Sequence, residues 1–366
     1  MSGGVDSSVT ALLLKQAGYE VIGCFIKGWY PEGMVCSWQT ERRDAMRVAG
    51  QIGILFETID LEKEYKKKVV DYMLASFKKG ETPNPDIMCN KYVKFGAFLD
   101  WAKKNGADYI ATGHYIKKSQ IPNSKKQTIS KLEIPKDANK DQTYFLWTLN
   151  QEQLKHCLFP LGNLTKPEVR EIAKKNNLST AEKKDSQGVC FIGEFEIIDF
   201  LKKYIKPKKG KIVDAQGKEI GEHDGIMFYT IGQRQGFSNG GGVPYYVVAK
   251  DCKKNILTVS DKADEKKYYN KEVMIDNVNW VSNEPKIGKL YQARIRYQQP
   301  LQACRVVNYE SRIINHEPEV KFKKSKIITH NSRFKIHFSK AQRAVTPGQS
   351  LVLYSGKIMI GGGIIV

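Results

Sequence analysis

Hydrophobic and polar residues follow two alternating patterns along the first two hundred residues. Stretches in which apolar positions recur every three or four residues, typical of amphipathic helices, are followed by short apolar runs typical of buried strands. This alternation predicts a parallel sheet covered by helices in an α/β domain spanning 1–205. The expected helices are Ser7–Ala17, Glu41–Ile52, Glu62–Phe77 and Phe95–Asn105, and the expected strands are Val21–Ile26, Leu55–Ile59 and Tyr109–Thr112.

The pattern changes near residue 205, where short strands punctuated by glycines and polar turns replace the helices. It predicts a small β-rich central domain at 206–268 and a C-terminal β-barrel at 269–366. We expect Lys253-Lys254-Asn255 to turn one hairpin, Glu317–Lys340 to form a longer one, and the polar segment Lys117–Lys131 to be a surface loop. The expected strands are Lys211–Val213, Tyr245–Ala249, Ile256–Val259, Val273–Val278, Tyr291–Arg296 and Ser350–Tyr354.

Composition narrows the class of protein. A chain of 366 residues exceeds one ordinary core, which agrees with several domains. The mean hydropathy is −0.45, and no apolar run reaches membrane-spanning length, so we expect a cytoplasmic protein with no membrane partner. The net charge of +20 favours a polyanionic partner, although a lysine-rich, merely solvated surface would give the same value. Charge alone does not choose between RNA, DNA and a membrane surface.

The cysteines exclude two classes of small scaffold. Their number is odd, their spacing is wide, and no CxxC pair occurs, which argues against a disulfide framework and a zinc ribbon. We therefore expect thiols, and those with a function should act through their reactivity. They are Cys24, Cys36, Cys89, Cys157, Cys190, Cys252 and Cys304.

A candidate phosphate-binding loop stands at the start of the chain, directly before an apolar helix. Two glycines let the backbone approach a phosphate, and hydroxyls and N–H groups at a helix N-terminus bind its oxygens. No lysine follows the loop, so it is not the GxxxxGK[ST] loop of kinases and GTPases. A plain glycine turn with a serine cap is the less favoured alternative. The loop is Ser2-Gly3-Gly4-Val5-Asp6-Ser7-Ser8.

This string resembles the signature of the PP-loop ATP pyrophosphatases, which adenylate a carbonyl oxygen and release pyrophosphate. The resemblance implies ATP and Mg²⁺ as cofactors, phosphate binding by the seven residues of the loop, and Asp6 near the metal. It also places Ile26 on the adenine side and lets the backbone at Gly113 approach the nucleotide. Such domains have a strand ahead of the loop, whereas Met1 directly precedes Ser2 here, so we expect the central strand to be absent or supplied otherwise.

Two further motifs contain cysteines that differ from the rest. In Thr82-Pro83-Asn84-Pro85-Asp86-Ile87-Met88-Cys89-Asn90 the prolines favour an extended loop, and Asn90 is predicted to cap the next helix. Cys89 would then lie near a helix N-terminus, where the dipole favours the thiolate, with Asp86 as a general base or base-holding residue. A buried structural cysteine is equally compatible with this motif. Cys190, in Asp185–Gly193, lies in a glycine-bounded loop, a setting more often structural than catalytic.

Taken together with further blocks, these motifs resemble the tRNA-specific 2-thiouridylases, bacterial and mitochondrial enzymes that thiolate the wobble uridine of Lys, Glu and Gln tRNAs. The likeness covers nearly the whole chain. One departure is Gln298-Gln299, where Arg-Gln is expected. The further blocks are Thr112–Tyr115, Lys140–Leu146, Phe159–Gly162, Tyr229–Gly236, Arg296–Gln298, Gln342–Gln349 and Gly361–Ile365.

The resemblance assigns roles to individual residues. Cys190 would accept sulfur as a persulfide from a sulfur-donor protein, and Cys89 would resolve it, leaving a disulfide or releasing sulfide. Asn84, Pro85 and Asp86 would contact the target base. The tRNA contacts would be Lys140, Asp141, Gln142, Arg296 and Tyr297.

Two rival interpretations remain open at this point. One is a PP-loop ligase acting on a small substrate, which gives no reason for the two cysteine motifs or the basic C-terminal half. The other is a non-catalytic RNA-binding relative. A requirement for tRNA in ATP–pyrophosphate exchange would separate the thiolase from the ligase.

Overall fold

The computed structural model describes residues 1–31, 38–122, 128–184, 197–234, 244–261, 265–315 and 328–366. These residues form two compact units, which are described separately. The first unit contains Met1–Leu74, Pro85–Tyr204 and Lys357–Met359, and the second contains Ala75–Asn84, Ile205–Gly356 and Ile360–Val366. The finer division at residues 205 and 268 stays a prediction.

The first unit has the expected α/β character. Strand β1 (Ile22–Lys27) pairs in parallel with β2 (Leu55–Asp60), and β3 (Ile110–Ala111) pairs in parallel with β6 (Cys157–Leu158). The pairing is parallel, as predicted, but among the described residues these strands form two separate pairs rather than one sheet.

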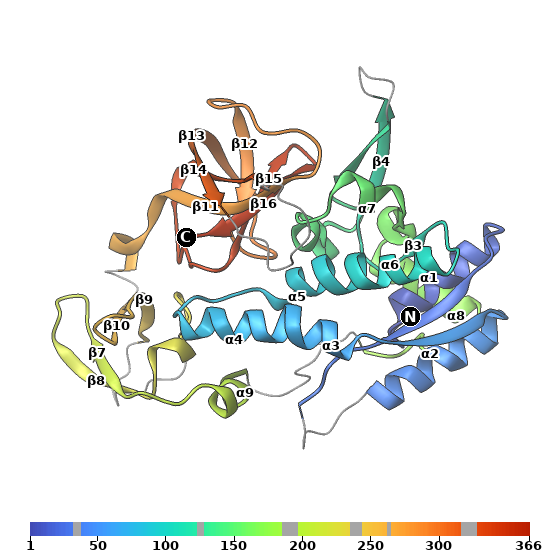
Figure 1. The fold of residues 1–366 in the computed structure, drawn as a ribbon, viewed down its shortest axis with the longest axis horizontal. Helices are drawn as coiled ribbons and strands as arrows, with labels where there is room; N and C mark the ends of the chain where they lie inside the picture. The colour runs from blue at the N-terminus through green and yellow to red at the C-terminus, as the bar shows by residue number, and fades with distance from the viewer. Residues whose placement is uncertain (32–37, 123–127, 185–196, 235–243, 262–264, 316–327) are drawn as a thin grey trace. The chain divides into compact units, whose positions relative to one another are not determined.

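Two helices of this unit lie side by side and point the same way. The apolar face of α1 (Val5–Gln16) packs against that of α8 (Lys166–Lys175) in one buried cluster. At their first turns Lys166 contacts Asp6, and at their ends the amide of Gln16 lies 3.5 Å from the side-chain oxygen of Asn176. Because both pairs of ends meet, the two helices are parallel and their N-termini are neighbours. Figure 1 shows the helices together near the start of the chain.

Two sequence predictions for this unit are corrected. The helix expected at 95–105 starts ten residues earlier, at Pro85, because proline lacks the N–H that the first helical turn leaves unused. The segment 117–131 is not a plain loop but includes the antiparallel strands β4 (Lys117–Pro122) and β5 (Thr128–Glu133). Its polar composition hid a period of two, in which Ser130 and Leu132 are buried.

The second unit is built from β-strands, as predicted. A four-stranded sheet has the order β8-β7-β10-β9, and its β9–β10 hairpin turns through Asn255, whose φ is 56°. A second sheet runs β11-β14-β13-β12-β15-β16, and β11 also pairs with β16, which closes a barrel. The long hairpin was predicted too late in the chain. The long antiparallel pair consists of β13, which ends before Glu317, and β14, and the two strands pair from Cys304↔Phe338 to Asn315↔Ile328.

The barrel encloses its own apolar core, to which aromatic residues and β-branched residues of alternating strand positions contribute.

No helix among the described residues is long and apolar enough to cross a membrane. The remaining helices are α2 (Trp38–Ile52), α3 (Glu62–Tyr65), α4 (Asp71–Lys78), α5 (Pro85–Met88), α6 (Phe98–Lys104), α7 (Gln151–Lys155) and α9 (Ile197–Tyr204). Shorter or wider turns are η1 (Lys66–Val70), η2 (Cys89–Ala97), η3 (Ala138–Lys140), η4 (Thr143–Leu146), η5 (Pro160–Asn163), η6 (Ile226–Phe228) and η7 (Glu265–Tyr268). The strands of the second unit are β7 (Gly210–Val213), β8 (Glu219–His223), β9 (Tyr246–Asp251), β10 (Ile256–Ser260), β11 (Asn270–Trp280), β12 (Leu290–Arg294), β13 (Gln302–Asn315), β14 (Ile328–Gln342), β15 (Ser350–Ser355) and β16 (Ile358–Ile365).

Candidate active site

The predicted phosphate loop forms the N-terminus of α1. Gly4 is the capping residue, with extended backbone angles, and no side chain caps the helix there. Gly3 has a φ of +74°, and a Cβ at this position would lie 2.3 Å from the carbonyl oxygen of Glu41. Only glycine fits such a backbone without strain. The loop therefore keeps backbone N–H groups at a helix N-terminus, as an anion site requires.

The three serines of the loop differ in their surroundings. Ser2 is exposed, and its N–H donates to the hydroxyl of Ser7 over 3.1 Å. Ser8 is fully buried; its hydroxyl donates to the carbonyl of Gly4 over 2.9 Å and accepts from Thr180 over 3.0 Å. Ser2 and Ser7 thus lie at the surface of the loop, whereas Ser8 supports the loop from within.

Three further residues assigned to the nucleotide occupy different environments. Val5 belongs to the buried core, and Ile26 is half-buried on β1. A Cβ on Gly113 would lie 2.9 Å from both the carbonyl carbon of Asp6 and the nitrogen of Ser7. Gly113 therefore lets its segment approach the backbone of the phosphate loop itself, a reason for glycine that the sequence did not reveal.

Asp6 is held by two side chains from distant parts of the first unit. Its Oδ1 accepts a hydrogen bond from the hydroxyl of Tyr115 over 2.8 Å, and the Nζ of Lys166 lies 2.7 Å from the same oxygen. The sequence analysis did not identify either partner. A third of the Asp6 side chain is exposed, whereas Lys166 is 11% exposed.

The residues at this end of α1 fit a nucleotide phosphate with magnesium. Mg²⁺ in phosphate sites takes one or two carboxylates and fills its shell with phosphate oxygens and water. Asp6 offers one such carboxylate at a helix N-terminus that its capping residue leaves without a side-chain hydrogen bond. The described residues contain no cluster of three or more metal-binding side chains.

Cys89 lies in a long helical segment, Pro85–Lys104, that we call the thiol helix (α5, η2 and α6). Asn90 was predicted to cap this helix, and that prediction is wrong. The helix already begins at Pro85, so Asn90 lies inside it, 2% exposed, where its amide donates to the carbonyl of Phe145 over 3.4 Å. Cys89 is 4% exposed, one turn from the start of the helix.

Two titratable groups near the thiol helix have shifted pKa values. Burial raises the pKa of the Asp86 carboxyl, and Lys94 opposes that shift. Burial, aided by Lys94, lowers the pKa of His114 well below its usual value, so its imidazole is neutral at pH 7. His114 packs against Phe95 and Phe159 and bonds to Thr112 over 2.8 Å. The raised pKa makes the Asp86 carboxylate more basic than an exposed one, whereas His114 is a packed core residue.

The segment 140–145 contacts the thiol helix directly and is linked to the phosphate loop through Tyr115. Asp141 is buried and accepts from the N–H and hydroxyl of Thr143, so it shapes the segment. The side-chain oxygen of Gln142 accepts from the N–H of Tyr115 over 2.9 Å, and Tyr115 binds Asp6. Phe145 accepts from Asn90, the neighbour of Cys89. One short segment therefore connects the two chemical motifs.

The comparisons with known proteins identify the family of the chain. Family models match at 1–194 (tRNA methyl transferase HUP domain), 198–261 (tRNA methyl transferase PRC-barrel domain) and 306–365 (aminomethyltransferase beta-barrel domain). A tRNA-specific 2-thiouridylase of Lactobacillus helveticus is 45% identical over 99% of this chain and 93% of its own. Those of Streptococcus thermophilus and Francisella tularensis subsp. novicida are 44% and 43% identical over 100% of this chain, and 93% and 98% of theirs. The chain belongs to the tRNA-specific 2-thiouridylase family.

The resemblance stated from the motifs is thereby confirmed, as is the fold of an α/β domain followed by a small domain and a barrel. Solved structures add nothing to it. An NMN synthetase from Francisella tularensis, 16% identical, aligns with 50% of this chain and 63% of its own at a TM-score of 0.32, which is too weak to carry an argument.

The second cysteine that the family implies, Cys190, lies outside the described residues. Of the described thiols, Cys24, Cys157 and Cys304 have pKa values raised chiefly by burial, the last two to about 12. Such thiols are inert as nucleophiles at neutral pH. Cys252 is exposed.

The tRNA contacts expected in the barrel lie in the second unit. The guanidinium of Arg296 donates to the carbonyls of Ile231 over 3.1 Å and Ala344 over 2.8 Å, so it ties two loops together. Tyr297 is half-buried beside it. Their assignment to RNA stays a prediction, and for Arg296 it would add to a structural role.

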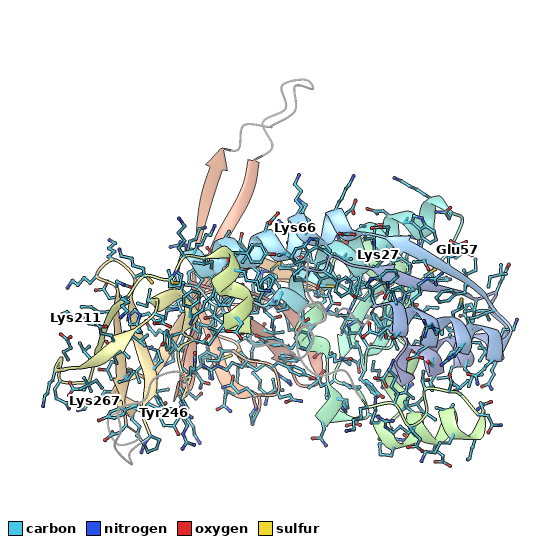
Figure 2. All side chains as sticks on the ribbon, turned by 90° about the horizontal axis from the view of Figure 1, so that it is seen from below. Lys27, Glu57, Lys66, Lys211, Tyr246 and Lys267 are labelled. Carbon is cyan, nitrogen blue, oxygen red and sulfur yellow. The ribbon has the colours of Figure 1, made fainter. Side chains whose placement is uncertain are left out.

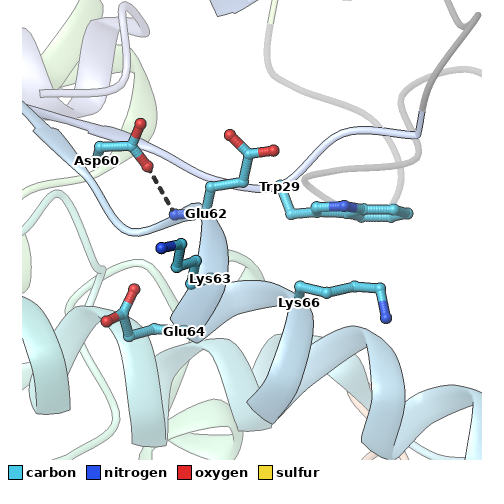
Figure 3. A pocket seen from close by; sticks show the side chains of 6 residues that line it. All are labelled: Trp29, Asp60, Glu62, Lys63, Glu64 and Lys66. Atoms are coloured by element: carbon cyan, nitrogen blue, oxygen red, sulfur yellow. Dashed lines mark hydrogen bonds between the residues drawn. The ribbon is translucent and has the colours of Figure 1, made fainter.

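An open hollow in the first unit lies where β1 and β2 end. It is lined by Trp29 and by charged residues of the β2–α3 connection and the helix that follows. Figure 3 shows the Asp60 carboxylate accepting from the N–H of Glu62, and the Trp29 ring facing Lys66. Among the residues that the structure describes, none of those assigned from the family lines it.

Proposed function

We propose that this chain is a tRNA uridine 2-sulfurtransferase. It adenylates the wobble uridine of tRNA Lys, Glu and Gln with ATP and replaces the 2-oxygen with sulfur from a cysteine persulfide. The supporting observation is the segment 140–145, which contacts Tyr115 beside the phosphate loop and Asn90 beside Cys89. Activation by ATP and attack by sulfur need neighbouring sites, and this segment connects the residues assigned to both.

The phosphate loop serves the first step. Its backbone N–H groups and the Ser2 and Ser7 hydroxyls bind phosphate oxygens while the uridine O2 attacks the α-phosphorus and pyrophosphate leaves. Mg²⁺, held by Asp6 and the phosphates, would neutralise charge on the leaving group. The carbonyl oxygen, a poor leaving group, becomes part of AMP, a good one.

The cysteines serve the second step. The outer sulfur of a Cys190 persulfide attacks C2 of the activated base, and the C–O bond to AMP breaks. The Cys89 thiolate attacks the inner sulfur, so the S–S bond of the persulfide breaks and a Cys89–Cys190 disulfide forms, which a cellular thiol must reduce. In the alternative order, Cys89 first releases sulfide, which then attacks the base.

Asp86 lies one helical turn from Cys89, where its carboxylate accepts a proton from the thiol or holds the target base. Its raised pKa brings it closer to the working pH, as a general base needs. Asn84 and Pro85, directly before it, would contact the same base. That base must leave the anticodon stack to be reached.

A basic surface supports tRNA as the substrate. The net charge is +20, and lysine residues such as Lys67 in the first unit and Lys267 in the second are exposed (Lys267 is labelled in Figure 2). Lysines of this kind bind phosphates without reading sequence. Lys140 and Gln142 in the first unit and Arg296 and Tyr297 in the second would add local contacts. A sulfur-donor protein and a cytoplasmic location complete the proposal.

Two other activities fit less well. Methyl transfer, the term in two of the family-model descriptions, gives no role to the phosphate loop or the cysteine motifs. A small-molecule ligase uses the loop but not Cys89 and Cys190. Dependence of ATP–pyrophosphate exchange on tRNA distinguishes the thiolase from the ligase.

The direct test supplies ATP, Mg²⁺, sulfide and unmodified tRNA-Lys, and measures 2-thiouridine by mass spectrometry. We expect product from the wild-type protein. With a persulfide donor in place of sulfide, Cys89→Ser and Cys190→Ser should lose it, while both retain tRNA-dependent ATP–pyrophosphate exchange. Exchange without tRNA, or thiouridine formation by both serine variants from the persulfide donor, would contradict the proposal.

A further inference from the structure

The phosphate loop lacks the lysine of the GxxxxGK[ST] loop, and the fold places a lysine there from far along the chain. The Nζ of Lys166 lies 2.7 Å from Oδ1 of Asp6, 160 residues away in sequence. It also lies 5.9 Å from the centre of the Tyr115 ring, which donates its hydroxyl to the same oxygen. Lysines are seldom buried, and this one is 11% exposed.

The backbone of Lys166 is firmly fixed. It is the first residue of α8, and the preceding Thr165 forms a capping box with Glu168. Its own N–H donates to Asp137 over 2.9 Å. The direction of the side chain is therefore set by a rigid helix start.

A lysine is an unfavourable residue at this end of a helix, because the dipole there favours negative charge. The N-termini of α1 and α8 converge, so two positive helix ends face the same place. Asp6 supplies one negative charge to this region. A bound polyphosphate would supply several, and Lys166 would then have an anion within reach besides Asp6.

We infer, on the basis of the proposed function, that Lys166 is the cation that binds the β- and γ-phosphates of ATP and the departing pyrophosphate. Asp6 holds the ammonium group until magnesium and nucleotide bind; the carboxylate then faces the metal, and the ammonium group faces the phosphates. Lys166 thus fills the position of the lysine that the loop sequence omits. The rival explanation is an ion pair that only fastens α1 to α8.

Binding measurements distinguish these explanations without the thiolation reaction. Calorimetric titrations with ATP, inorganic pyrophosphate and AMP, each with Mg²⁺, would compare wild type with Lys166→Gln. We expect a roughly 10- to 100-fold loss of affinity for ATP and pyrophosphate, the range for a hydrogen bond to a charged group, and no change for AMP. The matched control is Lys136→Gln. It removes a lysine that pairs with Glu168, a residue in the same helical turn as Lys166, and the variant should bind all three ligands normally.

A second variant covers the case in which Lys166→Gln fails to fold. Asp6→Asn frees Lys166 from its partner, so without metal it should bind pyrophosphate more tightly than wild type, whereas an ion pair with a purely structural role predicts no gain. If Lys166→Gln folds and binds pyrophosphate like wild type, or if Asp6→Asn shows no gain, the inference is wrong while the proposed function stands. A wild-type protein that binds neither ATP nor pyrophosphate overturns both.

Discussion

The phosphate loop and the thiol helix belong to the same unit but differ in how ready each is for chemistry. At the loop, the Asp6 carboxylate is partly exposed and contacts the side chains of Tyr115 and Lys166, which a ligand can displace. At the thiol helix, Cys89 and Asn90 are almost completely buried. The proposed nucleotide site is therefore accessible at Asp6, whereas Cys89, the described thiol of the proposed sulfur site, is closed to solvent.

This difference suits the order of the two steps. Adenylation needs a preorganised site for charge, and exposure to the nucleotide. Sulfur transfer needs a thiol protected from water and oxidants until the activated base arrives. Variants should therefore separate the steps, and four substitutions test that separation.

The largest effect is expected at the thiol helix. Asp86→Asn should lower single-turnover thiolation by roughly 10²–10⁴-fold, the usual contribution of a general base, and leave ATP–pyrophosphate exchange intact. The pKa of Asp86 is raised from its ordinary 3.8 by burial, so the acid limb of the wild-type pH profile should lie above that value and vanish in the variant. Loss of ATP–pyrophosphate exchange in Asp86→Asn would show that the two steps are not separable by substitution at the thiol helix.

The stability of Asp86→Asn should rise, although its thiolation rate falls. A carboxyl whose pKa is higher in the folded protein destabilises it as pH rises from the unfolded to the folded pKa, and the full cost remains above that range. Asp86→Asn removes the cost, so its free energy of unfolding at pH 7 should exceed that of wild type in denaturant titrations. A less stable variant would mean that Asp86 is held by compensating contacts.

How far sequence could predict these two regions depends on whether the signal was local. The phosphate loop is one contiguous motif, and its place at the start of α1 was predicted correctly. The predicted start of the thiol helix came too late in the sequence, although Pro85 is a typical first helical residue. The Lys166–Asp6 pair spans 160 positions, and no periodicity reports such a contact. The sequence analysis predicted no helix at α8, so it also missed the unusual position of Lys166 in a first helical turn, against the dipole.

The strand pattern was predicted well where one face is buried and poorly where polar residues fill both faces. β10 and β15 alternate or continue in apolar residues and were found. Half of the residues of β4 and β5 are lysine, serine or threonine, so the pairing of these strands depends on contacts that composition does not show. The single parallel sheet expected from alternation is two pairs among the described residues, because pairing partners follow from topology rather than from local pattern.

The next largest effect should appear at the phosphate loop. Gly113→Ala places a Cβ 2.9 Å from the backbone of Asp6 and Ser7, which must push the loop away. A displacement of about 1 Å costs roughly 100-fold in rate, so ATP–pyrophosphate exchange should fall by that order. Gly50→Ala, where a Cβ meets nothing within 4 Å, is the control. Unchanged exchange in Gly113→Ala would mean that the loop adapts and is less preorganised than the structure indicates.

A smaller effect, on both steps together, is expected at Gln142. Its side chain accepts from the N–H of Tyr115, and Phe145 in the same segment bonds to Asn90. Gln142→Ala removes one hydrogen bond, worth about 1 kcal/mol, so exchange and thiolation should each fall by less than about tenfold. Gln120→Ala, at an exposed position of β4, is the control. A loss confined to one step would show that the segment does not couple the two regions.

The smallest effect is expected at Cys157, which matches Cys89 in burial but not in position. Its thiol donates to the carbonyl of Gln153 over 3.0 Å, and burial raises its pKa to about 12. Cys157→Ala should lower the free energy of unfolding by about 1 kcal/mol and change neither exchange nor thiolation. Because both thiols are buried, a loss of thiolation in Cys157→Ala would mean that a position at the start of the thiol helix does not distinguish Cys89 from other buried thiols. A normal rate would show that the start of the thiol helix and the neighbouring Asp86, rather than burial, single out Cys89 as the reactive thiol.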